Sequence, residues 1–265
     1  MTVLDVQGLT VRTAEGTVLV DNLSLTVGRG ERLGLIGESG SGKSLTTLAV
    51  LGLLPRGITA TGSVELAGTQ IVGASEKQLT AVRGRDAAVV FQEPLTALDP
   101  LMRAGRQLAE PLRRRGLKGA ALKQAVTDAL EQVRLPEPDR IARSFPHEMS
   151  GGQRQRVALA MALACDPALL IADEPTTALD VSVQAEMLDL IDTLVRERDM
   201  AVVFVSHDLA VVARITDRAV VLRAGRAVEE GPVLDLVRAP GHAYTKSLVS
   251  SAQRLESALD LGGTR

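Results

Sequence analysis

The sequence GESGSGKS at residues 37–44 fits the phosphate-binding pattern G-x-x-x-x-G-K-S/T. It follows an apolar stretch, Leu33–Ile36, that predicts a buried strand, and it precedes Leu45–Leu54, which has helical composition and no internal proline. The glycines let several backbone N–H groups point at one phosphate chain, and the helix N-terminus adds its dipole at the same point. The stretch, a P-loop, therefore predicts a site for a nucleoside triphosphate.

Each residue of this loop is a candidate nucleotide contact. Lys43 can reach the β- and γ-phosphates, and the hydroxyl of Ser44 is a ligand for Mg²⁺. A chance glycine turn before a helix is the structural alternative, and the strand and helix that flank the loop argue against it. The predicted contacts are Gly37, Glu38, Ser39, Gly40, Ser41, Gly42, Lys43 and Ser44.

The composition is that of an ordinary globular protein and gives no sign of nucleic-acid binding. A chain of 265 residues is long enough for one large domain or two small ones. Hydrophobic residues make up 45% and aromatic residues only 2%, so aromatic stacking platforms for single-stranded nucleic acid are not available. The formal net charge of −2 gives no global field that favours DNA or RNA. We therefore expect no nucleic-acid partner.

Cysteine usage and the N-terminal sequence predict a cytoplasmic setting. Cys165 is the only cysteine, which excludes an intrachain disulfide and a cysteine metal cluster and fits a reducing compartment. The first residues lack the basic and then apolar pattern of a signal peptide, and no run approaches the roughly 18 apolar residues of a membrane span. We expect a cytoplasmic protein unless a partner brings it to a membrane.

The first third of the chain reads as strands and turns. Residues 3–36 alternate short apolar runs with turn sequences, and residues 62–73 add a further antiparallel piece. A buried strand is expected at Ala87–Phe91. This part predicts an antiparallel subdomain around the P-loop strand.

The remainder alternates strands with helices. From about residue 95 to 165, apolar residues recur at spacings of three or four, which predicts a helical insertion. Leu169–Ala172 and Ala201–Val205 are continuous apolar runs, typical of parallel strands covered on both faces, with a helix near Val183–Glu197 between them. The last thirty residues, from about Leu236, are expected to be helical and peripheral.

Two carboxylates end the apolar strand at 169–172. Asp173, at the strand end, can hold Mg²⁺ through its water shell opposite Ser44. Glu174, the next residue, is placed to polarise an attacking water as a general base. An Asp-Glu pair could simply open a loop, but its occurrence together with a P-loop favours the chemical role.

A second glycine-containing helix start lies at Met149–Gln153. The Ser-Gly-Gly step precedes an alanine-rich helix, Val157–Ala164, so it predicts a second anion site at a helix N-terminus. The structural alternative is a plain N-cap made by Ser150. The predicted contacts are Ser150, Gly151, Gly152 and Gln153.

Taken in order, these motifs resemble those of the nucleotide-binding subunits of ATP-binding cassette (ABC) transporters over nearly the whole length. The resemblance implies an α/β fold, with a P-loop NTPase core, an N-terminal antiparallel β subdomain and an inserted α-helical subdomain (the ABC ATPase fold). It implies an ABC ATPase domain over residues 1–235, with its helical subdomain at about 95–165, and a C-terminal helical extension over 236–265. The matching segments are 37–44, Gln92, Met149–Gln153, Asp173-Glu174, Ala178-Leu179-Asp180 and His207.

The resemblance also implies a composite active site. In this family two subunits sandwich two ATP molecules head to tail, so the P-loop of one chain meets the signature segment, here Ser150–Gln153, of the other. ATP and Mg²⁺ are the implied cofactors. The implied catalytic residues are Glu174, His207 and Gln92, and the implied metal ligands are Ser44, Gln92 and Asp173.

Three further segments, Phe91–Pro100, Phe145–Glu148 and Gly241–Thr245, resemble those of peptide and nickel importers within the family. Such importers pair two ATPase subunits, identical or different, with two permeases and an extracytoplasmic substrate-binding protein. The resemblance implies a peripheral location on the cytoplasmic face of the cell membrane. Many peptide-importing members extend beyond the third segment and carry cysteines there, so the end at Arg265 favours the nickel or metallophore branch.

One position departs from the family pattern. An aromatic residue in the N-terminal hairpin usually stacks on adenine, whereas the equivalent here is Thr13 and no aromatic residue precedes Phe91. We therefore expect weak discrimination between ATP and GTP. An exporter, a soluble ABC protein acting on DNA or the ribosome, and a non-catalytic regulatory subunit are the alternative readings. The Phe91–Pro100 segment disfavours an exporter. The single cassette disfavours the soluble class, and the intact motifs disfavour a regulatory subunit.

Overall fold

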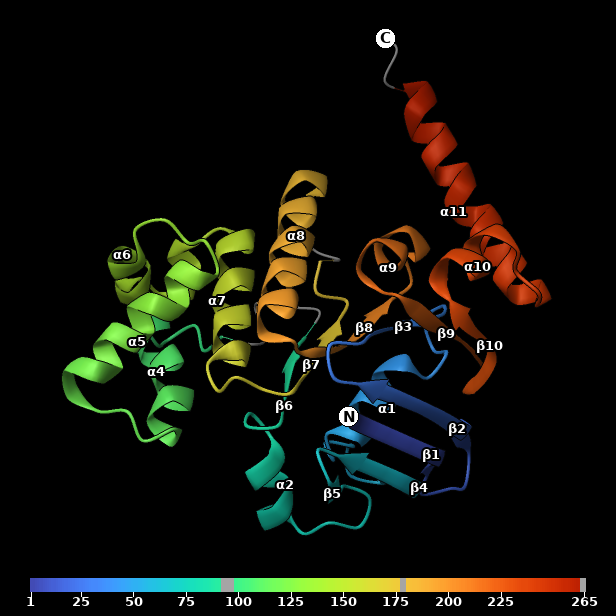
Figure 1. Ribbon diagram of the computed structural model, residues 1–265, viewed down its shortest axis with the longest axis horizontal. Helices are drawn as coiled ribbons and strands as arrows, with labels where there is room; N and C mark the ends of the chain where they lie inside the picture. The colour runs from blue at the N-terminus through green and yellow to red at the C-terminus, as the bar shows by residue number, and fades with distance from the viewer. Residues whose placement is uncertain (92–97, 177–179, 263–265) are drawn as a thin grey trace. The chain divides into compact units, whose positions relative to one another are not determined.

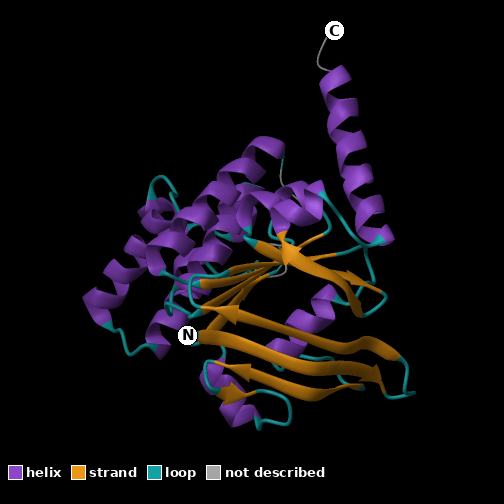
Figure 2. Cartoon of the chain, turned by 45° about the vertical axis from the view of Figure 1, so that its right-hand side comes forward, coloured by secondary structure: helices purple, strands orange, loops and turns teal. Residues whose placement is uncertain are grey.

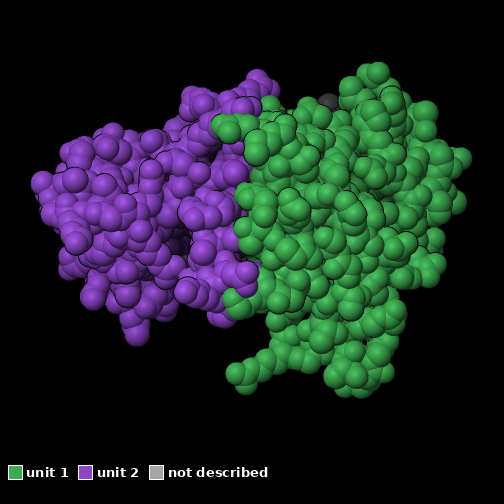
Figure 3. All heavy atoms as spheres, turned by 60° about the horizontal axis from the view of Figure 1, so that its bottom comes forward, with its two compact units in different colours: residues 1–75, 202–265 green, residues 76–201 purple. Residues whose placement is uncertain are grey.

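The computed structural model describes residues 1–91, 98–176 and 180–262 of the chain. These residues form two compact units, one of residues 1–75 and 202–265 and the other of residues 76–201 (Figure 3). Each unit has its own strands and helices and is described by itself. Across the described ranges, no helix combines the length and the apolar composition needed to cross a lipid bilayer.

The first unit contains an antiparallel sheet, whose strands are among those drawn in orange in Figure 2. Its strand order is β2-β1-β4-β5. Its strands are β1 (Thr2–Thr13), β2 (Val18–Gly28), β4 (Ile58–Leu66) and β5 (Thr69–Gln70). Alternate residues of β1 and β2 are buried, as expected of a sheet with one face on the core. The buried face contacts helix α1 (Lys43–Val50). The antiparallel subdomain predicted from the sequence is confirmed.

The first unit also contains the P-loop strand, β3 (Arg32–Ile36). It lies between β8 (Ala201–Ser206) and β9 (Arg218–Arg223) and is parallel to both, while β10 (Arg226–Pro232) pairs antiparallel with β9. Helix α9 (Leu209–Ile215) packs on β3. The continuous apolar runs of β3, β8 and β9 follow from burial on both faces, whereas β10 is charged and partly exposed.

The C-terminal segment of the first unit is helical, as predicted. It forms α10 (Val233–Arg238) and α11 (Ala243–Gly262), and α11 contacts α9 (Figure 1). The first turn of α11 is not peripheral, because Tyr244 and Thr245 are both buried.

The second unit joins a parallel strand pair to a group of helices. The pair is β6 (Ala87–Val90) and β7 (Leu169–Asp173), and every residue of β7 is buried. Most of the apolar stripe predicted between residues 95 and 165 is buried among the helices that follow β6, as at Leu108, Leu112, Val126, Leu130 and Val133, whereas Leu122 is half-buried. The helical elements are α2 (Glu76–Val82), α4 (Ala104–Arg114), α5 (Gly119–Gln132), α6 (Pro138–Arg143), a 3₁₀ turn at Pro146–Glu148, α7 (Gly151–Leu163) and α8 (Val181–Arg198).

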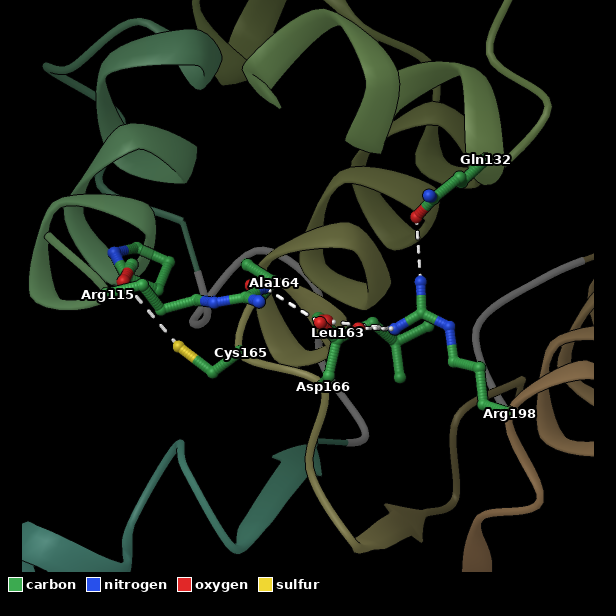
Figure 4. Close-up of polar contacts among 8 residues, drawn as sticks. Arg115, Gln132, Leu163, Ala164, Cys165, Asp166 and Arg198 are labelled. Carbon is green, nitrogen blue, oxygen red and sulfur yellow. Dashed lines mark hydrogen bonds and ion pairs between the residues drawn. The ribbon is translucent and has the colours of Figure 1, made fainter. Parts of the chain in front are cut away.

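Two arginines close the carboxyl end of α7 (Figure 4). Arg115 donates to the carbonyl of Ala164 at 2.7 Å, and Arg198 donates to that of Leu163 at 3.0 Å. Asp166 forms ion pairs with both guanidinium groups, at 2.8 and 2.9 Å. The last carbonyls of a helix lack partners within it, so this cluster satisfies them and ties α7 to the ends of α4 and α8.

Arg218 joins three segments of the first unit. Its guanidinium pairs with the carboxylates of Glu31 and Glu230 and donates to the carbonyl of Thr26. Burial acts to raise the pKa of Glu31, but the hydrogen bonds from Arg218 and from the N–H of Gly28 outweigh it and lower that pKa below its usual value. The cluster fixes the strand that leads into the P-loop at its N-terminal end.

This lowered pKa predicts a pH dependence of stability. A carboxyl with a depressed folded-state pKa contributes stability that is present above its unfolded pKa, near 4.3, and is lost as the pH falls through the folded value. Glu31→Gln should lower the free energy of unfolding at pH 7 by about 1 kcal/mol, and the difference should shrink between about pH 5 and pH 3. Urea titrations across this range measure it. Glu230→Gln is the matched control at the same arginine, and an equal pH dependence in both variants would contradict the assignment to Glu31.

Candidate functional site

The P-loop follows β3, and two of its positions require or favour glycine. The first is limited by the space for a Cβ and the second by its backbone angle. A Cβ at position 37 would lie 2.3 Å from the carbonyl oxygen of Leu222, so only glycine fits there. Gly42 has φ of 103° and caps α1 in the left-handed region, which favours glycine. These two constraints explain the first and last glycines of the motif.

The loop between them presents backbone to solvent in front of a helix N-terminus. Glu38, Ser39 and Gly40 are exposed, and so is Ser44 in the first turn of α1. The N-cap residue of α1 is Gly42, which has no side chain with which to cap the helix. The N–H groups at a helix N-terminus and the helix dipole favour an anion, so the arrangement fits a phosphate chain.

Two buried polar side chains lie beneath this exposed rim. The ammonium of Lys43, whose side chain is buried, donates to the carbonyl oxygens of Gly37 at 2.6 Å and Glu38 at 3.0 Å. The hydroxyl of Ser41 is buried and has no hydrogen-bond partner in the part of the chain that the structure describes. A buried hydroxyl and a buried ammonium beneath an exposed, glycine-rich loop are chemically suited to a polyphosphate.

Magnesium would be held here by few protein ligands. Among the described residues, no group of three or more His, Cys, Asp or Glu side chains could hold a metal ion. Mg²⁺ in nucleotide sites keeps several waters and takes one or two protein oxygens together with phosphate oxygens. The exposed hydroxyl of Ser44 suits that role without an acidic cluster.

The two predicted carboxylates lie at the end of β7 in the second unit. Asp173 is buried as the last residue of the strand, and Glu174 follows with φ of 48°, in the left-handed region. A non-glycine residue held there is strained by about 1–3 kcal/mol, and such strain is concentrated at functional sites. The next residue, Pro175, accepts a hydrogen bond through its carbonyl from the side chain of Gln155 at 2.7 Å.

Gln155 was not identified from the sequence. Its side chain is buried in α7, and its Oε1 has no hydrogen-bond partner within the described residues. It links the helix of the signature segment to the backbone just after Glu174. The sequence gives no signal for this role, because Gln155 stands between two arginines and its burial depends on the folded structure.

The signature segment opens α7 as a capped helix. Ser150 is the N-cap: its hydroxyl accepts from the N–H of Gln153 at 3.2 Å, and the Gln153 side chain accepts from the N–H of Ser150 at 3.0 Å. A Cβ at Gly152 would lie 2.8 Å from a methyl group of Val183, so glycine lets α8 approach. The capping interpretation therefore holds, and it leaves the N–H groups of Gly151 and Gly152 at the helix start.

A cavity of about 480 Å³ adjoins this helix start. The signature residues line it together with Arg134 and Arg156, and with Asp180 and Glu186 from the α8 side. Arg156 is paired with Glu186 at 2.9 Å. The cavity thus brings charged side chains of both signs to the glycines of the signature, and its preference for an anion rests on the N–H groups of the helix start rather than on a net positive charge.

His207 is exposed and directly follows β8. Because Ile36 of β3 pairs with Ser206 of β8, the P-loop and His207 leave the sheet at the same edge. Asp208 caps α9 by accepting from the N–H groups of Ala210 and Val211. Gln92, Ala178 and Leu179 lie outside the described residues.

Tyr244 is a second residue that the sequence analysis did not assign to the site. Its hydroxyl accepts a hydrogen bond from the N–H of Glu38 in the P-loop at 2.9 Å. The two residues lie 206 positions apart, so no local pattern could have paired them. The only signal was the Gly241–Thr245 segment, whose function the sequence does not reveal.

Comparison with known proteins supports the fold and the family resemblance. The family model described as ABC transporter matches residues 20–177. A Brucella ovis protein, provisionally named a peptide import ATP-binding protein, is 46% identical over 98% of this chain and 80% of its own length. A glutathione import ATP-binding protein of Salmonella typhimurium is 45% identical over 96% of this chain and 42% of that longer protein. A solved dimeric ATP-binding cassette in a post-hydrolysis state, bound to ADP and Pi, has a TM-score of 0.76 and 29% identity over 87% of this chain and 98% of its own.

Because the backbone of Glu174 is left-handed, replacing this residue by glycine should raise stability while it lowers the rate of hydrolysis. Glu174→Gly should raise the free energy of unfolding by about 1 kcal/mol, because glycine adopts positive φ without strain. Glu174→Ala, the control, removes the same carboxylate but retains the strain and should bring no such gain. Both variants should lose at least about 100-fold in nucleotide hydrolysis if Glu174 acts as the general base. A glycine variant no more stable than the alanine variant in thermal unfolding would contradict the strain argument.

Proposed function

Because the chain belongs to the ABC transporter family, we propose that it is the ATP-hydrolysing subunit of an importer of small peptides. The similarity over 98% of the chain to a relative provisionally named for peptide import is the observation that carries the proposal. The relative named for glutathione import points to the same substrate class, since glutathione is a short peptide. The fold is the ABC ATPase fold that the sequence predicts.

The P-loop residues bind the triphosphate in this proposal. Backbone N–H groups of the loop and of the first turn of α1 cradle the phosphates, and Lys43 moves from its carbonyl partners to the β- and γ-phosphates. Mg²⁺, when bound, neutralises charge on the phosphate oxygens. Ser44, Asp173 and Gln92 are the proposed protein groups around it.

Hydrolysis needs a water that is oriented and polarised. Glu174 is the proposed general base for that water, and its left-handed backbone is a strain of the kind that is concentrated at functional sites. His207, which leaves the sheet beside the P-loop strand, is proposed to contact the γ-phosphate. Gln92 is proposed to sense the γ-phosphate or its metal.

A second ATPase subunit would complete each site. The signature helix start, with the N–H groups of Gly151 and Gly152 beside a cavity, is suited to the γ-phosphate held by another chain. The structural relative bound to ADP and Pi is a dimer, which agrees with this arrangement. We propose that ATP closes such a dimer and that hydrolysis opens it.

Two permeases and an extracytoplasmic binding protein are the proposed remaining components. The chain would then act at the cytoplasmic face of the membrane, and the permeases and binding protein would select the substrate. Peptides are favoured over nickel or a metallophore because both named importers above are named for peptide or glutathione import. No observation favours export or action on nucleic acid.

The proposal predicts an ATP-trapped complex. The Glu174→Gln variant, tagged and purified in mild detergent with ATP from its native membrane, should carry two permeases and a second ATPase, which mass spectrometry would identify. Its hydrolysis should be at least about 100-fold slower than that of the wild type. Lys43→Ala in the same background is the control, because it cannot hold the phosphates and should not form the trapped dimer. Recovery from the soluble fraction alone, without membrane partners, would refute the transport function.

Thr13 predicts weak base selectivity. It lies at the end of β1, where its hydroxyl accepts from the N–H of Thr17 in the hairpin turn. Without an aromatic ring, the wild type should hydrolyse ATP and GTP with kcat/KM values within about tenfold of each other. Thr13→Tyr should tighten ATP binding by roughly tenfold, since stacking on a base contributes about 1–3 kcal/mol. Tripolyphosphate, which has no base, is the control ligand; equal gains for both ligands would contradict the adenine contact.

A further inference from the structure

We propose that Tyr244 is a positioning residue of the P-loop, and that its hydroxyl sets the affinity for nucleotide by fixing the orientation of the peptide group between Gly37 and Glu38. The inference rests on the proposed function, since it requires the loop to bind nucleotide. It gives the C-terminal segment, which lies far from the loop in sequence, a defined part in that binding.

One peptide group of the loop is held from both of its polar ends. Its N–H, on Glu38, donates to the Tyr244 hydroxyl at 2.9 Å. Its C=O, on Gly37, accepts from the ammonium of Lys43 at 2.6 Å. A rotation of this peptide plane would break both hydrogen bonds together.

The two hydrogen bonds strengthen each other. An acceptor on the N–H polarises the peptide and makes its carbonyl oxygen a better acceptor. In the same way, the ammonium bound to the carbonyl oxygen makes the N–H a better donor to the tyrosine hydroxyl. Lys43 is only 6% exposed, so the acceptors around its ammonium offset much of its desolvation. The tyrosine hydroxyl therefore acts on the lysine through one shared peptide.

Tyr244 is itself held rigidly enough to serve as an anchor. It is buried, the Arg223 guanidinium lies 5.0 Å from the centre of its ring, and its N–H donates to His242 Nδ1 at 3.1 Å. The carboxylate of Glu229 in β10 accepts from the N–H groups of Gly241 and His242. The start of α11 is thus fixed to the same sheet that carries the P-loop.

Nucleotide binding makes this anchor more important. When the Lys43 ammonium moves to the phosphates, the Gly37 carbonyl loses its strongest donor and the peptide is then held chiefly by Tyr244. An anchored peptide keeps the loop in the conformation that receives phosphate, so the tyrosine contributes to affinity without touching the reacting atoms. Its loss should raise KM and the dissociation constant and leave kcat nearly unchanged.

The first test is Tyr244→Phe, which keeps the ring beneath Arg223 and removes only the hydroxyl. Calorimetric titration with MgADP should give a dissociation constant about 3- to 10-fold higher than that of the wild type, the range expected for one neutral hydrogen bond. Ser247→Ala is the matched control: Ser247 donates to the carbonyl of Tyr244 within the same helix but does not reach the loop. It should bind MgADP as the wild type does.

Steady-state kinetics separate positioning from a general loss of structure. KM for ATP should rise in parallel with the dissociation constant while kcat stays within about twofold. An equal fall in kcat for the Tyr244 and Ser247 variants, with unchanged KM, would overturn the inference. If the wild type itself binds no nucleotide, the proposed function fails as well. If the wild type binds and Tyr244→Phe binds equally well, only this inference fails.

A second measurement needs no variant. The chain has a single tyrosine and no tryptophan, so 3-fluorotyrosine incorporated during expression gives one ¹⁹F resonance, that of Tyr244. Because Lys43 and the tyrosine share one peptide, moving the lysine to phosphate should shift this resonance during titration with MgADP. A resonance that does not move at saturation, as judged by calorimetry on the same sample, would overturn the proposed link.

Discussion

The parallel pairing of β3 with β8 on one side and β9 on the other is the constraint on which the first unit depends. A strand paired along both edges cannot shift its register without breaking two ladders, so the point where the P-loop leaves the sheet is fixed. Close packing adds to this: a Cβ at Gly34 would lie 2.4 Å from a methyl group of Val212, and one at Gly37 would meet Leu222. The loop geometry is therefore imposed by the sheet beneath it.

The parts of the fold that could be predicted are those with a strong local signal. The buried runs at β3, β7 and β8 stand out because parallel strands covered on both faces need continuous apolar sequence. The P-loop helix was expected from Leu45 but begins at Lys43, because the left-handed Gly42 already caps it. The hairpin of β9 and β10 was not identified: β10 is half-exposed and charged, and its position depends on pairing with β9 rather than on its own pattern.

The candidate site divides in the same way. The motifs identified the phosphate loop, the strand-end carboxylates and the signature glycines, because each needs a particular residue type at a particular spacing. They could not identify the hydrogen bond from Gln155 to Pro175 or the one from Glu38 to Tyr244, since both join segments that meet only after folding. The positive φ of Glu174 could not be predicted either, because the residue types at the end of a strand do not determine the backbone angle there. The residues that carry the chemistry of the site can thus be predicted from the sequence, whereas the residues that hold them in position cannot.

Helix α7 is fastened at both ends, by the capping box at Ser150 and by the arginine cluster around Asp166. Helix ends normally fray, because their terminal N–H and C=O groups lack partners within the helix. With 13 residues, α7 is about 20 Å long, and with both ends closed it should move as a rigid rod. A shift of the signature glycines would then arrive undiminished at the far end of the helix, where α4 and α8 are attached. The hydrogen bonds and ion pairs at its two ends would thus couple the position of the signature glycines to that of the opposite end of the helix.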